Sequence, residues 1–183
     1  MPQANLQNLE AAIQALEAEI DTAADLNACA AAWAEKGRLL QRLERNTSAL
    51  AAYDRALELM PGLESAWMRK ALLLDELDRT DEALAAYAGL LTHHPRHVAG
   101  WSNRAGLMLR EGRFDDALEC LNCAIESDPE GEANALLCLN KGLLLLQAFD
   151  RPGEALPWIE RAIPTGFPEA AEALALCQEA LNG

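Results

Sequence analysis

The chain has 183 residues, of which 51% are hydrophobic, and its formal net charge at pH 7 is −14. Alanine and leucine, which favour helices, make up much of the hydrophobic fraction, whereas valine, isoleucine and threonine, which favour strands, are scarce. The composition therefore predicts an all-α protein, and the length suffices for a sizeable buried core. The negative charge argues against nucleic acid and against an anionic membrane surface as partners.

The first predicted helix covers residues 5–21, "NLQNLEAAIQALEAEID". Its apolar residues recur every three or four positions and form one stripe: Leu6, Leu9, Ile13, Leu16 and Ile20. We interpret this stripe as the inner face of a capping helix. The same spacing is also that of a coiled-coil seam, so self-association through this helix is the alternative.

From about residue 30 the sequence repeats with a period of 34 residues, which aligns Trp33, Trp67 and Trp101. Small residues, an aromatic residue or leucine, and a closing proline align with the same period: Gly37, Ala71 and Ala105; Ala49, Ala83 and Ala117; Tyr53, Tyr87 and Leu121; Ala56, Leu90 and Ala124; Pro61, Pro95 and Pro129. Each unit is predicted to be two helices joined by a polar turn. The small residues let the helices approach closely, and each proline stops the second helix.

The polar turns contain residues that suit the start of a helix. Thr80 with Asp81, and Asp115 with Asp116, are predicted to cap the second helices and to place negative charge at their positive ends.

A fourth unit is present but irregular. Ala155 and Ala162 lie 38 residues after Ala117 and Ala124, and Gly142 lies 37 after Ala105. About three extra residues therefore fall near "GEAN", and one more lies in the turn "FDRPG". Cys138 replaces the tryptophan, and Pro157 is expected to kink the second helix or delay its start. The following "PEAAEALALCQEAL" is predicted to be a helix that covers the last unit.

This pattern resembles the tetratricopeptide repeat (TPR) family over about residues 30–167, and "EGRFDDALECLNCAIESDP" is particularly close to the family's second helix. The resemblance implies a right-handed superhelix of antiparallel helix pairs. The expected units are residues 1–29 (N-terminal cap), 30–63, 64–97, 98–131 and 132–168 (four repeats, the last irregular) and 169–183 (C-terminal cap).

The resemblance also implies a concave groove, lined by the first helices, that holds a peptide or helix of a partner protein. Helical phase predicts that this groove presents Arg38, Arg42, Ser65, Met68, Arg69, Leu72, Ser102, Asn103, Arg110 and Asn140. Asn103 and Asn140 match the family position whose amide often bonds a ligand backbone, although such a residue can equally bond to water. The arginines can bind carboxylates of an acidic and apolar segment, or pair with Glu35, Asp75 or Glu111 of their own surface.

Some family members bind chaperone tails through a clamp of lysine and asparagine. The clamp positions of the first three units hold Ala34, Arg38, Arg69, Ala99 and Asn103 here, so we expect no such binding.

Enzymatic chemistry has little support in this sequence. The three histidines, His93, His94 and His97, form "HHPRH" between two repeats, where an incidental pair in a solvated loop competes with a metal site. Cys120 and Cys123 form a CxxC, but inside a predicted helix, which favours packing thiols over a redox or zinc site. We therefore expect a non-enzymatic adaptor without metal or cofactor. Self-association through residues 5–21 and a metal- or thiol-active protein are the alternatives.

The sequence contains no signal for export or membrane insertion. The start "MPQANLQNLEA" has neither a basic nor an apolar signal-peptide region, and the aliphatic run Leu143–Leu146 is far too short to span a bilayer. The odd number of cysteines, five, is typical of reduced thiols, so a cytoplasmic protein is expected.

Overall fold

The computed structural model describes residues 3–22, 24–131 and 134–182. Over these residues the chain is helical and contains no strand, which confirms the predicted all-α class. The helices are α1 (Gln3–Thr22), α2 (Leu26–Arg42), α3 (Asn46–Leu59), α4 (Glu64–Glu76), α5 (Thr80–His93), α6 (Val98–Arg110), α7 (Phe114–Ser127), α8 (Asn134–Gln147), α9 (Pro152–Ala162), the short 3-10 helix η1 (Ile163–Thr165) and α10 (Pro168–Asn182).

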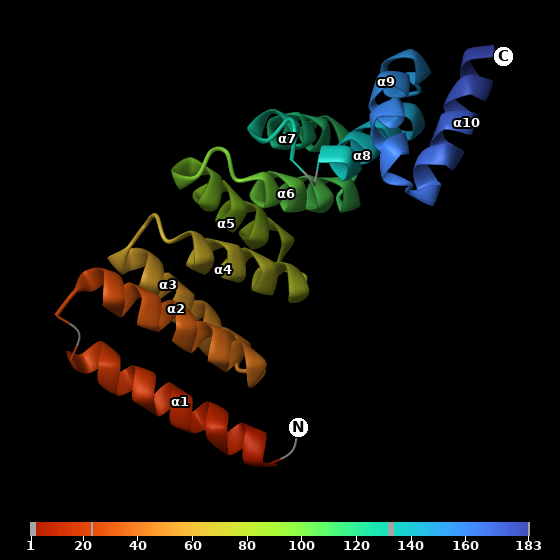
Figure 1. Ribbon diagram of the computed structural model, residues 1–183. Helices are drawn as coiled ribbons and strands as arrows, with labels where there is room; N and C mark the ends of the chain where they lie inside the picture. The colour runs from red at the N-terminus through yellow and green to blue at the C-terminus, as the bar shows by residue number, and fades with distance from the viewer. Residues whose placement is uncertain (1–2, 23, 132–133, 183) are drawn as a thin grey trace. The chain divides into compact units, whose positions relative to one another are not determined.

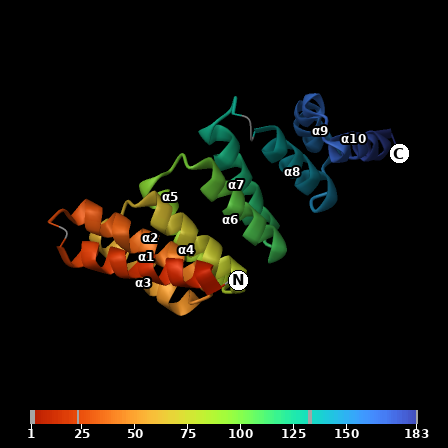
Figure 2. The ribbon, with the colours of Figure 1, turned by 60° about the horizontal axis from the view of Figure 1, so that its bottom comes forward.

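The chain divides into two compact units, Met1–Pro95 and Arg96–Gly183. In the first unit α2 pairs with α3 and α4 with α5, α3 contacts α4, and α1 lies along α2 (Figure 1). In the second unit α6 pairs with α7 and α8 with α9, α7 contacts α8, and α10 packs on α9 and α8 (Figure 2). The repeating sequence unit is thus one helix pair.

Small residues set the close approach within each pair. Ala49, Ala83, Ala117 and Ala155, at equivalent positions of the four second helices, are completely buried. A Cβ atom on Gly37 would lie 2.6 Å from the Tyr53 ring, and one on Gly142 would lie 2.5 Å from Ile159. The neighbouring helices therefore occupy the space that a larger side chain would need.

The tryptophans of the first unit occupy equivalent positions. Trp33 and Trp67 pack against the same small cluster of buried residues, which includes Ala56 and Ala66. The Trp67 indole also donates a hydrogen bond of 2.7 Å to the Pro61 carbonyl. The predicted prolines follow the ends of the second helices, since α3, α5 and α7 each stop two residues before Pro61, Pro95 or Pro129.

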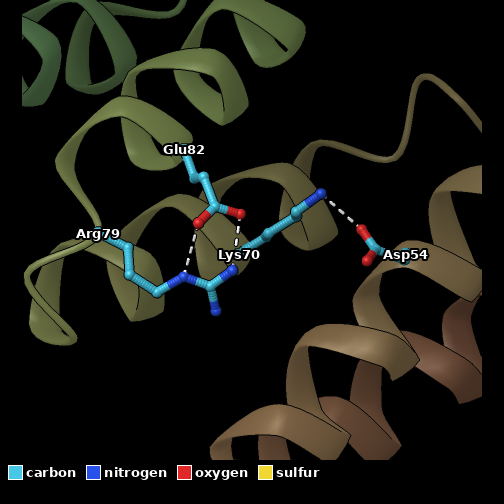
Figure 3. A network of polar contacts seen from close by, with 4 residues as sticks. All are labelled: Asp54, Lys70, Arg79 and Glu82. Carbon is cyan, nitrogen blue, oxygen red and sulfur yellow. Dashed lines mark hydrogen bonds and ion pairs between the residues drawn. The ribbon is translucent and has the colours of Figure 1, made fainter.

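The predicted side-chain caps on the second helices are wrong. Arg79 and Arg113 are the residues that precede α5 and α7, and neither helix has a side-chain cap. Thr80, Asp81, Asp115 and Asp116 lie inside the first turn, one to three positions after the residue that precedes the helix. The acidic residues nevertheless lie at the positive ends of α5 and α7, as predicted. Arg79 forms an ion pair with Glu82, at 2.7 and 2.6 Å, next to the Lys70–Asp54 ion pair (Figure 3).

The turns between the paired helices share one backbone feature in all four repeats, although the turn between α8 and α9 is one residue longer than the other three. Glu44, Asp78, Gly112 and Asp150 each have a positive φ, of 60°, 55°, 70° and 51°. Three of these residues are not glycine, although L-residues seldom adopt this conformation. The positive φ at this position of the turn therefore does not require glycine.

The fourth repeat keeps the positive-φ residue, Asp150, in a turn that is one residue longer, and its second helix starts two residues after Asp150, as in the other repeats. α9 begins at Pro152, directly after Arg151, because proline suits the first turn, where no amide donor is needed. The expected delay by Pro157 is therefore wrong, and Pro157 lies inside α9.

The predicted insertion, "GEAN", lies partly outside the described residues, but Asn134 at its end is visible. Its buried side-chain oxygen accepts hydrogen bonds from Arg161 and from the Cys138 thiol, both at 3.1 Å, and its amide donates to the Asp128 carbonyl at 3.2 Å. Asn134 thereby ties the loop after α7 to α8 and α9.

Candidate protein-binding surfaces

A hollow of about 460 Å³ lies on the first unit, over α2 and α4. We call it the arginine hollow, and its lining residues are Arg38, Gln41, Arg42, Arg69 and Glu76. Three of the predicted groove residues, all arginines, are thus brought together by the stacking of two first helices.

The arginines of this hollow differ in their partners. Arg38 is held by Glu35, one turn away on α2, through two hydrogen bonds. These bonds, together with the nearby positive charges of Arg69 and Arg42, hold the pKa of Glu35 below its usual range. Arg38 is therefore engaged on its own helix, as one of the two interpretations of the sequence anticipated.

Arg42 and Arg69 are exposed, and among the described residues neither makes a hydrogen bond or an ion pair. Gln41 and Glu76 of the same hollow take part in hydrogen bonds: the Tyr53 hydroxyl donates to Gln41 at 3.2 Å, and Gln41 donates to Glu76 at 3.0 Å. The two available guanidinium groups suit the binding of a carboxylate.

The other predicted groove residues of the first unit lie on α4. Leu72 is 39% exposed and stands one turn after Arg69, Ser65 is exposed, and Met68 is half-buried. An apolar surface therefore adjoins the arginine hollow.

A second hollow, of about 490 Å³, lies on the second unit. We call it the apolar hollow, and it is lined by Leu109, Phe114, Asn140, Leu143, Leu144, Gln147 and Ala148. Asn140 is the predicted groove residue found there. Ser102 and Asn103 are half-buried on α6 and Arg110 is exposed at its end, all three outside this lining.

Sequence reasoning missed Phe114. This residue is 41% exposed at the first position of α7, where the other second helices begin with Asn46, Thr80 or Pro152. A large aromatic residue at a turn position that is otherwise small or polar was the signal that could have revealed it.

The N-terminal stripe faces its own chain. Leu9 and Ile13 are 5% and 6% exposed, Leu16 and Ile20 are half-buried, and α1 lies on α2. Ion pairs of 2.7 Å join Glu10 to Arg45 and Glu17 to Lys36. Leu6 remains 38% exposed, so most of the stripe acts here as the inner face of a cap.

Two of the three histidines have structural hydrogen bonds. The His94 ring bonds to the Gly62 carbonyl at 2.9 Å, and His97 Nδ1 accepts from the Gly100 amide at 2.9 Å, which caps α6. His93 is exposed at the end of α5. The histidines are therefore not merely an incidental pair in a solvated loop, because two of them hold the local structure. Within the described ranges, no group of three or more His, Cys, Asp or Glu residues could hold a metal ion.

Cys120 and Cys123 are free thiols on α7, the first buried and the second half-buried. Burial raises the pKa of both thiols. A raised pKa lowers the fraction of reactive thiolate, which argues against redox chemistry at this CxxC.

Models of the tetratricopeptide repeat match residues 30–62, 68–132 and 109–171. The chain belongs to the tetratricopeptide repeat family. Members of this family are helical scaffolds for protein interactions, and this TPR chain has the helix pairs of such a scaffold. In the described part of the chain, no helix has the length and apolar character needed to cross a membrane.

Several solved structures share the fold of this TPR protein. A tetratricopeptide repeat protein from Parabacteroides merdae is similar with a TM-score of 0.70 and 20% identity, over 98% of this chain and 69% of that one. MamA is similar with a TM-score of 0.71 and 14% identity, over 84% of this chain and 82% of that one. YrrB, described as a TPR protein with an unusual peptide-binding site, has a TM-score of 0.64 and 18% identity, over 98% and 87% of the two chains. A comparison with curated proteins gave no match.

Proposed function

We propose that this TPR protein is a non-enzymatic adaptor that binds a peptide or helix of a partner protein, with acidic residues of the partner in the arginine hollow. The observation that carries the proposal is the pair Arg42 and Arg69, two exposed guanidinium groups over one hollow that make no ion pair within the described residues. On a chain of net charge −14, unpaired arginines gathered in one place favour an anionic ligand.

The apolar hollow adds a second type of contact. Its leucines and Phe114 offer room for an apolar side chain, and Asn140 at the same site has both a donor and an acceptor for a peptide group. A partner segment with acidic and apolar residues therefore fits the chemistry of the two units, each taken separately. The five free cysteines further support a reducing compartment such as the cytoplasm.

Self-association through the N-terminal stripe is the weaker candidate. Leu9 and Ile13 are already buried within the chain, so a coiled coil through this stripe would require α1 to leave α2.

The test is capture of partners from a soluble lysate of the source organism by wild-type protein and by Arg42→Glu/Arg69→Glu, with mass spectrometry as the readout. We expect a protein that the wild type captures and the variant loses. The control is Arg55→Glu/Arg79→Glu, which makes the same charge change at two arginines outside the hollow, each paired with a glutamate three residues later. Partners that the hollow variant retains in full, or that both variants lose equally, would refute the proposal.

A further inference from the structure

The outer face of α10 is both acidic and apolar. Glu172, Leu176 and Glu179 are spaced by four and then three residues, so they lie on one face of the helix. Leu176 is 53% exposed, whereas Ala170, Ala173 and Cys177 on the opposite face are buried in the last hydrophobic cluster. A capping helix is expected to present a polar outer face, and an exposed leucine between two glutamates departs from that pattern.

The carboxylates of this face are available. Within residues 134–182, as the structure describes them, Glu169, Glu172 and Glu179 make no ion pair or hydrogen bond, and α10 contains no basic residue. The outer face of α10 thus combines free negative charge with an exposed leucine.

The arginine hollow has the complementary combination. Arg42 and Arg69 are exposed there without ion-pair partners among the described residues, and Leu72, at 39% exposure, stands one turn from Arg69. Each surface therefore offers two available like charges near an exposed leucine, with opposite signs of charge. The lining of the hollow also includes Arg38 and Glu76, which are bonded to Glu35 and Gln41.

We propose that α10 of a second copy of this chain is a partner segment of the arginine hollow. This inference rests on the proposed function, because it names an occupant for the same hollow. Glu172 and Glu179 of one copy accept hydrogen bonds from Arg42 and Arg69 of the other, while Leu176 packs on Leu72. The two glutamates are about 10 Å apart along the helix axis at the usual rise of a helix, too far apart for both to bind one guanidinium group.

The N-terminal helix is a poorer occupant, although it is also acidic. Glu10 and Glu17 are already paired with Arg45 and Lys36, and the apolar stripe between them is turned toward α2. The overall repulsion between two chains of charge −14 acts only over short distances, because the Debye length at physiological ionic strength is about 8 Å. Local complementarity therefore decides the contact.

Such a contact joins two different surfaces, and each chain carries one of each. Association is then head to tail, and it continues into larger assemblies or closes as a ring. This arrangement makes a specific prediction for mixtures of variants.

The experiment is sedimentation velocity of the full chain over a series of concentrations. Wild type is expected to self-associate, whereas Arg42→Glu/Arg69→Glu and Glu172→Lys/Glu179→Lys are each expected to remain monomeric. A mixture of the two variants contains one intact hollow and one intact α10, and its two altered surfaces carry opposite charges, so association is expected to return in the mixture. The control, Glu19→Lys/Asp21→Lys, makes the same charge change on α1 and is expected to associate like wild type. Circular dichroism checks that each variant is folded.

A wild-type chain that stays monomeric at every concentration would overturn the inference, as would assemblies that survive Glu172→Lys/Glu179→Lys or a mixture that fails to associate. These results are distinguishable from failure of the proposed function. If the wild-type chain is monomeric but still captures another protein through Arg42 and Arg69, the adaptor function stands and the second-copy partner alone is refuted.

Discussion

Replacing glycine by alanine is expected to have opposite effects at two helix positions of the second unit, Gly142 on α8 and Gly106 on α6. A Cβ atom on Gly142 would lie 2.5 Å from Ile159 Cγ1, and 3.3 Å from both the Ala155 oxygen and the Ile159 amide nitrogen. Carbon atoms in good contact are about 3.5 to 4 Å apart, so the new methyl group overlaps its neighbour by about 1 Å. The overlapping atom, Cγ1, is bonded to the Cβ of Ile159, whose side chain is completely buried, and the two close α9 backbone atoms cannot rotate away. The overlap is therefore relieved only by moving Ile159 within the packed core or by shifting α9.

The magnitude follows from two opposing terms. An extra methyl group in a packed core costs about 1 to 3 kcal/mol, and loss of a glycine from a helix interior gains about 1 kcal/mol. Gly142→Ala is therefore expected to lower the free energy of unfolding by about 1 kcal/mol or somewhat more. At Gly106 no atom lies within 4 Å of the new Cβ, so Gly106→Ala keeps only the helical gain and raises that free energy by about 0.5 to 1 kcal/mol.

The assay is urea unfolding of the full chain followed by circular dichroism, with the midpoint and slope compared for wild type and the two variants. Because both glycines lie in the second unit, the same structural unit reports both changes. If Gly142→Ala stabilises the protein as Gly106→Ala does, the argument that α9 occupies the space at Gly142 is refuted.

Two further predictions concern buried titratable groups. Burial raises the pKa of Tyr53 to about 12, whereas an unfolded tyrosine titrates near 10, so the stabilising effect is complete below pH 10 and is lost as the pH rises toward 12. Tyr53→Phe also removes the hydrogen bond to Gln41, so it is expected to lower the free energy of unfolding by about 1 kcal/mol at pH 7. Between pH 10 and 12 the free energy of unfolding of this variant is expected to fall less than that of the wild type. An equal fall would contradict the raised pKa of Tyr53. Burial also raises the pKa of Cys120 and Cys123, so at pH 8 both are expected to react with an alkylating reagent much more slowly in the folded chain than in urea, as measured by peptide mass spectrometry. Equal rates in the two states would show that these thiols are accessible and reactive.

Much of the fold was predictable from the sequence because the repeat depends on small residues at positions where the paired helices approach closely. The alanines at 49, 83 and 117 and the glycine at 37 occupy places where only small side chains fit, so their period of 34 residues reports the helix pairs directly. The prolines after the second helices act through a missing amide donor, which is a local property. The helix starts were less predictable, because the positive φ of Asp78 and Gly112 moves Arg79 and Arg113, and not a threonine or aspartate, to the residue before the helix.

The candidate surfaces were predictable only in part. Helical phase selected Arg38, Arg42 and Arg69 together, and the structure places all three around one hollow. Which of them is available depends on neighbours that phase does not reveal: Arg38 is held by Glu35, while Arg42 and Arg69 have no ion-pair partner among the described residues. The exposed Phe114 was missed for a similar reason. Its position in the lining of the apolar hollow, with residues of α8, depends on how two helix pairs pack together.

By itself, the sequence determined the all-α class, the repeat period, the helix pairs and the family, since each depends on local propensity or on residues that must be small. Tertiary structure decided which charges are already paired, which leucines remain exposed and where hollows form. Glu10 and Glu17 of α1 and Glu172 and Glu179 of α10 look alike in sequence, yet the first two are neutralised by Arg45 and Lys36 while the last two face outward without an ion-pair partner in the described chain. The physical reason is that pairing of charges and exposure of apolar side chains depend on contacts between residues far apart in the sequence, which no local pattern records.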